Sequence, residues 1–202
     1  MFKVGITGRI GSGKSTVCRV LEVLGVPIFK ADDEGKRILQ EDADAKRAVI
    51  ALFGDAMYPE GKLDRKALAA IVFNDEAALE KLNSIVHPLV RERFRVWAEE
   101  RQAPYVVMEA AILMETGGHK QMDHIVVVHA REVDRVARVI ARDGVTEDEV
   151  RARIKNQIGK ERIGITDSVI MNDGLQLLLP QVIALHTLLL EKAKHLPLTQ
   201  AG

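Results

Sequence analysis

The sequence predicts an α/β fold in which a five-stranded parallel sheet carries helices, with a helical insertion and a helical lid. An apolar run at residues 2–6 leads through a glycine-rich loop into an amphipathic helix. Four further short apolar runs alternate with helical patterns, as in a sheet built from strand–helix–strand units. Residues 43–101 carry helical patterns and few strand signals, which indicates a helical part between the second and third strands.

Length and composition restrict the class of protein. A chain of 202 residues suits one α/β domain, or one domain with an inserted helical part. The 29 Lys and Arg residues balance the 29 Asp and Glu residues, which argues against a general nucleic-acid binder. The single cysteine, Cys18, excludes an intramolecular disulfide and fits a reducing cytosol. No apolar run reaches the roughly 18 residues of a membrane span, and no signal-peptide pattern is present, so we expect a cytoplasmic protein with no membrane partner.

The first loop matches the phosphate-binding pattern Gly8-x-x-x-x-Gly13-Lys14-Ser15. Its glycines let the backbone close around phosphate, and the N–H groups that open the following helix favour an anion. Lys14 supplies a cation for the β- and γ-phosphates, and the Ser15 hydroxyl is a ligand for Mg²⁺. The residues expected to bind ATP in this loop are Gly11, Ser12, Gly13, Lys14, Ser15 and Thr16. The pattern predicts a P-loop NTPase-type three-layer sandwich.

Two adjacent carboxylates follow the second strand, expected at residues 26–29. Asp32 and Asp33 lie where ligands of an open α/β sheet bind, outside the carboxyl ends of the strands. A phosphoryl transferase needs a carboxylate there to orient the acceptor hydroxyl and take its proton. Position alone leaves open which carboxylate acts and which caps the next helix.

The helical part offers candidate contacts for a phosphorylated acceptor. His87 and Pro88 are expected to begin a helix, because proline suits a first helical turn. His87 is then a base, a phosphate donor or only a helix-start residue. Arg91, Arg93 and Arg95 are either phosphate ligands or charges on a solvated helix face.

An acidic residue ends the third strand, at residues 104–109. A phosphate-loop enzyme often holds Mg²⁺ at this position, through water. Glu109 is therefore the first candidate and Glu115 the second, with a solvated or capping carboxylate as the alternative for Glu115.

Two basic helices follow the fourth strand, at residues 125–128. The first is expected over residues 131–142, and Thr146 to Glu149 form a capping box for the second. Arg138 and Arg142 share one face, which suits a mobile lid that brings cations to the triphosphate. Surface salt bridges within the helices are the alternative.

The last predicted strand, at residues 168–171, ends at Asn172 on the ligand edge of the sheet. Asn172 either contacts the nucleotide base of ATP or holds the following turn by its own hydrogen bonds.

Taken in chain order, these segments resemble the dephospho-coenzyme A kinase family. The matching segments are Thr7–Ser15, Lys30–Asp32, Leu63–Arg65, His87–Arg91, Ala111–Glu115, Arg138–Gly144, Ala152–Gln157 and Val169–Gly174. The resemblance implies transfer of the ATP γ-phosphate to the ribose 3′-hydroxyl of dephospho-coenzyme A, the last step of coenzyme A synthesis, with Mg²⁺.

The resemblance also implies roles for individual residues. It selects Asp32 over Asp33 as the catalytic carboxylate, beside Lys14, Arg138 and Arg142. Acceptor binding is expected at Asp32, Arg65, His87, Arg91 and Glu115. ATP binding extends to Arg142 and Asn172, and Mg²⁺ is expected on Ser15 and, through water, on Glu109.

Three positions depart from the family pattern: Arg9 replaces a glycine, Lys30 an aspartate and Ala111 a proline. Lys30 either lies close to Asp32 and favours its ionised form, or points away, since alternate strand residues face opposite sides.

We expect one kinase domain with three parts. The nucleotide-binding core covers about 1–42, 103–130 and 164–195, the acceptor-binding part about 43–102, and the lid about 131–163. The expected partners are small molecules and no nucleic acid, with the chain a monomer or a small homo-oligomer. The alternatives are a kinase for another small molecule and a nucleotide-dependent switch or ATPase subunit; a guanine-specifying Asn-Lys-x-Asp is absent.

Overall fold

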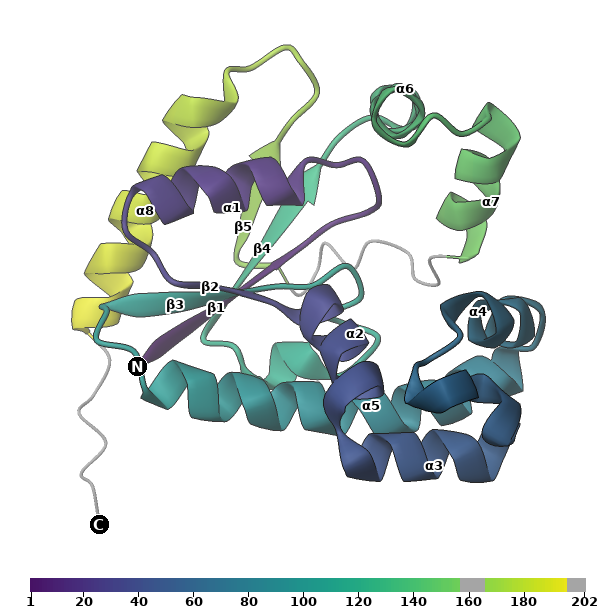
Figure 1. The fold of residues 1–202 in the computed structure, drawn as a ribbon. Coiled ribbons are helices and arrows are strands. Elements are labelled where there is room, and N and C mark those ends of the chain that lie inside the picture. The colour runs from purple at the N-terminus through teal and green to yellow at the C-terminus, as the bar shows by residue number, and fades with distance from the viewer. Residues whose placement is uncertain (157–165, 196–202) are drawn as a thin grey trace. The chain divides into compact units, whose positions relative to one another are not determined.

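The computed structural model describes residues 1–156 and 166–195. The chain divides into two compact units, one of residues 1–30 and 98–202 and one of residues 31–97. The first unit contains the sheet, and the second consists of helices (Figure 1). The end of the expected lid, with Gln157, lies outside the described residues.

All five strands belong to the first unit. They are β1 Phe2–Thr7, β2 Ile28–Lys30, β3 Tyr105–Glu109, β4 His124–His129 and β5 Ser168–Met171. Their order is β2-β3-β1-β4-β5, and every neighbouring pair is parallel, which confirms the predicted sheet. In the described part of this unit the helices are α1 Lys14–Val23, α6 Glu132–Asp143, α7 Glu147–Asn156, α8 Leu178–Lys194 and the short η3 Gly118–Gln121.

The strand order decides where a ligand can bind. The chain leaves β1 in the middle of the sheet, with β3 on one side and β4 on the other. Ile6 is in register with Glu109 of β3 and with Val126 of β4, so the three strands end at one edge. The loop after β1 therefore lies at a topological switch point, where open α/β sheets bind ligands.

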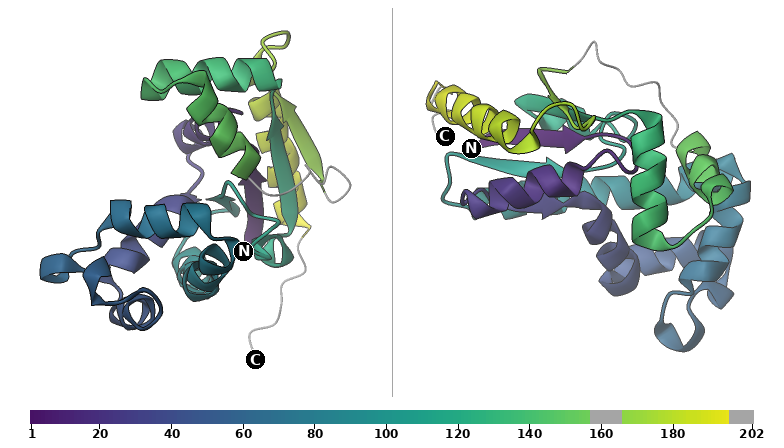
Figure 2. Two further views of the ribbon diagram at one scale, coloured as in Figure 1. Left: turned by 90° about the vertical axis from the view of Figure 1, so that its right-hand side faces the viewer. Right: turned by 90° about the horizontal axis from the view of Figure 1, so that it is seen from above.

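One face of the sheet is covered by α1 and α8, which lie side by side (Figures 1 and 2). Alternate strand residues, such as Val4 and Ile6 of β1, point to this face and are fully buried. Val17 and Leu21 of α1 and Leu189 of α8 meet them, so the helix after the phosphate loop is anchored in the core.

The second unit contains the remaining helices. They are α2 Ala31–Glu41, α3 Ala43–Phe53, α4 Arg65–Asn74 and most of α5 Glu76–Glu99, with the short η1 Asp55–Met57 and η2 Pro59–Gly61. Asp64 caps α4 by accepting hydrogen bonds from the backbone N–H groups of Lys66 and Ala67. The unit begins at Ala31 and therefore includes the helix that carries Asp32.

The expected helix start at His87 and Pro88 is wrong, because Pro88 lies inside the continuous helix α5. A proline in a helix interior costs about 3 kcal/mol. Buried apolar residues at intervals of four offset this cost, since each large apolar side chain contributes about 1.5–3 kcal/mol when removed from water. The buried stripe consists of Ala78, Leu82, Val86, Val90, Phe94 and Ala98.

Two other element starts differ from expectation by two residues or more, and further ends differ by one residue. β2 begins at Ile28 rather than at residue 26. The last helix begins at Leu178 rather than near Leu175. Gly174 has a φ of 78°, and Asp173 Oδ1 accepts a hydrogen bond from the Leu175 N–H, so the turn continues past Leu175.

Candidate active site

The phosphate loop is held in a conformation that requires glycine, as Gly11 and Gly13 show. Gly11 and Gly13 have φ values of 76° and 99°, which side chains disfavour. A Cβ on Gly11 would overlap the backbone of Arg135 in α6, and one on Gly13 would overlap the side chain of Asn172. The loop is therefore pressed between α6 and the segment that follows β5.

The first turn of α1 presents the groups that bind phosphate. The helix begins at Lys14 and no side chain caps it, while the Thr16 N–H donates to the Gly13 carbonyl at 3.0 Å. The first N–H groups of a helix lack partners within it, which favours an anion there. The Lys14 ammonium donates a hydrogen bond to the carbonyl oxygen of Gly8, at 2.8 Å. The cation thus lies across the loop, where the β- and γ-phosphates of a nucleotide are bound in this motif.

Ser15 and Glu109, the two residues expected to hold magnesium, lie in contact, and their metal-binding role stays a prediction. The Ser15 hydroxyl donates a hydrogen bond to Glu109 Oε1 at 2.8 Å, which joins α1 to the end of β3. A hydroxyl and a carboxylate oxygen are ligands that suit Mg²⁺, which keeps several waters and takes its other ligands from substrate phosphates. The described residues contain no cluster of three His, Cys, Asp or Glu side chains for a metal, and Mg²⁺ bound in this way requires none.

Arg138 and Asn172 support the loop from its other side. Asn172 Nδ2 donates to the carbonyl oxygen of Ser12 at 2.8 Å. Arg138 donates to the Asn172 carbonyl oxygen at 2.8 Å and to that of Gly11 at 3.4 Å. The guanidinium of Arg138 is therefore beside the phosphate loop, and its expected role as a lid arginine stays a prediction. The Asn172 side chain is bonded to the loop itself, and its expected contact with the base of ATP stays a prediction.

Arg142 is placed differently from Arg138. It lies in the last turn of α6, exposed, and its guanidinium forms a two-point ion pair with Asp143 at 2.7 and 3.1 Å. This hydrogen bonding lowers the pKa of Asp143. An ATP contact by Arg142 would require it to leave Asp143, and the role stays a prediction.

Ile10 is a functional candidate that sequence reasoning missed. It belongs to the phosphate loop, yet its side chain packs against the buried cluster formed by the two helices α6 and α7. The cluster consists of Val136, Val139, Val150 and Ile154. A large apolar side chain within a glycine-rich loop was the available signal, since such a group favours burial against a neighbouring element.

The helical unit holds most of the expected acceptor-binding residues. Asp32 lies in the first turn of α2 with an exposed side chain, two residues after the end of β2. His87 and Arg91 lie one helical turn apart on α5, and burial and the charge of Arg91 together lower the pKa of His87. Arg65 is exposed at the first position of α4.

Comparison with known proteins places the chain in a family. The model of the dephospho-CoA kinase family matches residues 2–177. The chain belongs to the dephospho-CoA kinase family. A dephospho-CoA kinase of Salinibacter ruber is 45% identical over 180 residues, which cover 86% of this chain and 90% of the relative.

Solved structures share the fold of this chain. The crystal structure of TT1252 from Thermus thermophilus has a TM-score of 0.80 at 35% identity, covering 94% of this chain and 97% of that one. The fold also matches that of dephospho-CoA kinase from Campylobacter jejuni, with a TM-score of 0.66 at 24% identity, covering 94% and 98% of the two chains.

Two positions of the dephospho-CoA kinase pattern are informative in this chain. Lys30, which replaces an aspartate, pairs with Glu22 of α1 at 3.5 Å, so its ammonium is directed toward that helix. Glu115 is exposed in the turns that follow β3, while Glu109 is the carboxylate that contacts Ser15. The geometry favours Glu109 over Glu115 for magnesium.

Proposed function

We propose that this protein transfers the γ-phosphate of ATP to the ribose 3′-hydroxyl of dephospho-coenzyme A, giving coenzyme A and ADP. The observation that carries the proposal is a formed phosphate loop, with the Ser15–Glu109 pair beside it, in a chain that matches the dephospho-CoA kinase family over residues 2–177. The reaction is the final step of coenzyme A synthesis.

On the nucleotide side, the chain supplies N–H groups and cations. The backbone from Gly11 to Thr16 surrounds the phosphates, and Lys14 exchanges its bond to the Gly8 carbonyl for the β- and γ-phosphates. Arg138, already beside the loop, stabilises negative charge on the transferring group. Arg142 joins it when the lid closes and excludes water.

Ser15 and Glu109 would hold Mg²⁺, Ser15 directly and Glu109 through water. The bound ion would neutralise charge on the β- and γ-phosphates. Within the protein, the two residues keep the start of α1 next to the end of β3, so the loop and the acidic strand end stay together.

On the acceptor side, Asp32 accepts a hydrogen bond from the attacking 3′-hydroxyl, orients it and takes its proton. Arg91 and Arg65 provide cations for the phosphates of the acceptor, and His87 and Glu115 complete the acceptor site. We keep the expected division of the domain into a nucleotide-binding core, an acceptor-binding part and a lid, because it separates these residues in the same way.

The setting of the enzyme is also a proposal. We place it in the cytoplasm, because a single cysteine in 202 residues fits a reducing compartment, and we expect a monomer or a small homo-oligomer. The described helices include none that is long and apolar enough to cross a membrane.

An acceptor panel tests the proposal. ADP release is measured with ATP and Mg²⁺ in the presence of dephospho-coenzyme A, nucleosides, nucleotides or sugars, and products are identified by mass. Dephospho-coenzyme A should stimulate ADP release and gain one phosphoryl group, whereas Lys14→Ala should abolish both signals. A stronger response to another acceptor would favour a different small-molecule kinase, and ATP hydrolysis without a phosphorylated product would favour a switch or ATPase.

A further inference from the structure

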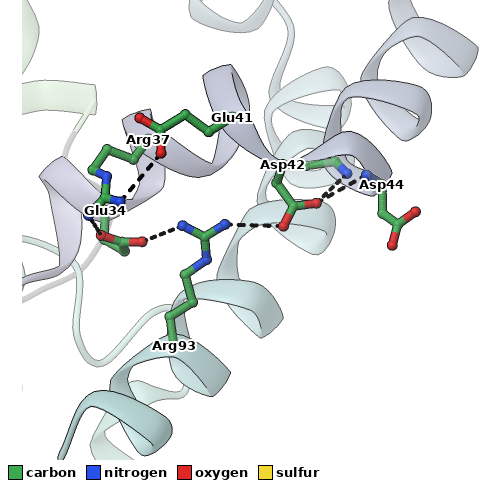
Figure 3. A network of polar contacts seen from close by, with 7 residues as sticks. Glu34, Arg37, Glu41, Asp42, Asp44 and Arg93 are labelled. Atoms are coloured by element: carbon green, nitrogen blue, oxygen red, sulfur yellow. Dashed lines mark hydrogen bonds and ion pairs between the residues drawn. The ribbon is translucent and has the colours of Figure 1, made fainter.

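Arg93 joins three helices of the second unit (Figure 3). From α5, one guanidinium nitrogen contacts Glu34 Oε1 of α2 at 2.6 Å, and the other contacts Asp42 Oδ2 at the start of α3 at 3.2 Å. The fork of a guanidinium suits two carboxylates held at fixed positions. We call Glu34, Asp42 and Arg93 the three-helix clamp.

The three-helix clamp is better shielded than ordinary surface ion pairs. The Glu34 side chain is 12% exposed, Asp42 23% and Arg93 32%. The second partner of Glu34, Arg37, is 61% exposed and lies on the same helix α2 (Figure 3). Shielded pairs are screened less by salt and water, so Arg93 contributes more to helix placement than Arg37 does.

Asp42 gives the clamp a rigid end. Its Oδ1 caps α3 by accepting hydrogen bonds from the N–H groups of Asp44 and Ala45, while Oδ2 faces Arg93. The hydrogen bonds from Ala45 and Arg93 lower the pKa of Asp42, so its charge persists at neutral pH. A charged cap held from both sides restricts where Arg93 can lie.

The packing beside the clamp brings α2 close to α5. Gly35, next to Glu34, faces Val86 and Val90 of α5, and a Cβ on it would lie 3.4 Å from Val86 Cγ1. Ile38, one turn further on, is fully buried. Small size at Gly35 and the charges at Arg93 therefore fix the same pair of helices.

These two helices carry proposed active-site residues. Asp32 lies two residues before Glu34 on α2, and His87 and Arg91 lie on α5, six and two residues before Arg93. We propose that Arg93 is a positioning residue, which sets Asp32 on α2 relative to the acceptor-binding side chains of α5. This inference rests on the proposed function. The sequence left two interpretations of Arg93, a phosphate ligand or a charge on a solvated helix face. A phosphate contact is disfavoured because the carboxylates of Glu34 and Asp42 already neutralise the charge of Arg93.

Arg93→Met tests the inference by removing the charge and the fork while keeping much of the apolar stem. We expect kcat to fall about tenfold and KM for dephospho-coenzyme A to rise about fivefold or more, with KM for ATP within about twofold of the parent. Arg93→Lys keeps a single charge and should recover part of the loss, because an ammonium reaches one carboxylate but not both in the same geometry.

Arg37→Met is the matched control. Arg37 also contacts Glu34, but its two ion-pair partners, Glu34 and Glu41, both lie on its own helix α2. Its kinetic constants should stay within about twofold of the parent. Thermal midpoints are measured for all variants, and kinetics are read well below the lowest midpoint.

Two results would overturn the positioning role. One is unchanged acceptor kinetics in Arg93→Met. The other is a fall in kcat with both KM values unchanged and with no recovery in Arg93→Lys, which indicates only a smaller folded fraction. If the parent protein fails to phosphorylate dephospho-coenzyme A, the proposed function fails first, and that outcome is separate from either result.

Discussion

At the scale of single residues, two adjacent carboxylates of α2 differ in their contacts. Asp33 Oδ1 contacts the ammonium of Lys36 one turn along the helix, at 2.8 Å. Asp32 has an exposed side chain in the same turn, directly after the strand that ends at the ligand edge of the sheet. The local pairing of Asp33 agrees with the assignment of Asp32 as the base.

Asp32→Asn should lower kcat by about 10²-fold or more while the affinity for ATP changes little, because an amide cannot take the proton of the attacking hydroxyl. Steady-state kinetics with both substrates and nucleotide titration measure the two quantities. Asp33→Asn is the matched control, and its kcat should stay within a few-fold of the parent. A larger loss in Asp33→Asn than in Asp32→Asn would reverse the assignment.

Glu109→Gln tests the metal site, because it keeps an oxygen that can accept the Ser15 hydrogen bond but removes the negative charge. The Mg²⁺ concentration for half-maximal rate should rise about fivefold or more, since carboxylate charge favours the cation. Glu115→Gln is the comparison, and its Mg²⁺ dependence should match the parent. An unchanged Mg²⁺ requirement in Glu109→Gln would remove Glu109 from the site.

At the scale of elements, the phosphate loop packs against the helices α6 and α7. Ile10 inserts from the loop into the cluster of α6 and α7, and Arg138 of α6 bonds to the loop carbonyl of Gly11. An apolar contact and a charged one therefore link the same two elements. Any displacement of α6 changes the surroundings of the loop backbone that binds phosphate.

Ile10→Ala should raise KM for ATP about threefold to tenfold, because the loop loses an apolar contact that helps to hold it in shape. Val145→Ala is the control, since Val145 packs against the same cluster but lies outside the loop. The KM of Val145→Ala for ATP should stay within about twofold of the parent value. This should hold even if Val145→Ala lowers the thermal midpoint as much as Ile10→Ala does. Equal effects of the two substitutions on KM would show that lid stability, and not loop shape, is what matters.

At the scale of the whole molecule, a buried histidine makes stability depend on pH. His124 starts β4 and lies within hydrogen-bond distance of the Ser168 hydroxyl of β5, at 2.9 Å. Burial is the main cause that lowers the pKa of His124; Lys192 acts in the same direction and Asp167 opposes it. His124 therefore binds a proton more readily in the unfolded chain than in the folded protein. The contribution of neutral His124 to the free energy of unfolding is fully present above the ordinary imidazole pKa of about 6.5.

The free energy of unfolding should therefore fall as pH decreases from about 6.5 through the lowered pKa of His124. Urea unfolding at several pH values measures this slope. His124→Gln keeps an amide that can bond to Ser168 but does not titrate, so its slope should be smaller. Part of the slope should remain, since the pKa of His87 is lowered as well. An equal slope in parent and variant would contradict the assignment to His124.

Much of the fold was predictable because its signals are contiguous in the chain. The strand, loop and helix of residues 2–23 follow one another without interruption, so their order is visible without any tertiary structure. The capping box at Thr146 was equally predictable, since Thr146 and Glu149 hydrogen-bond within one turn. The break expected at Pro88 was wrong, because a local rule about proline was outweighed by the buried stripe along α5.

The sequence by itself determined the phosphate loop, the acidic end of β3 and the family, because these depend on residue types at short spacings and in a given order. The tertiary structure decided which distant groups meet. Asn172 reaches Ser12 across 160 positions, Arg138 reaches Gly11 across 127, and Arg93 reaches Glu34 across 59. Such partners depend on strand order and helix packing, which place residues together regardless of their separation along the chain. Three arginines therefore have different contacts: Arg138 supports the phosphate loop, Arg142 pairs with its neighbour Asp143, and Arg93 joins helices.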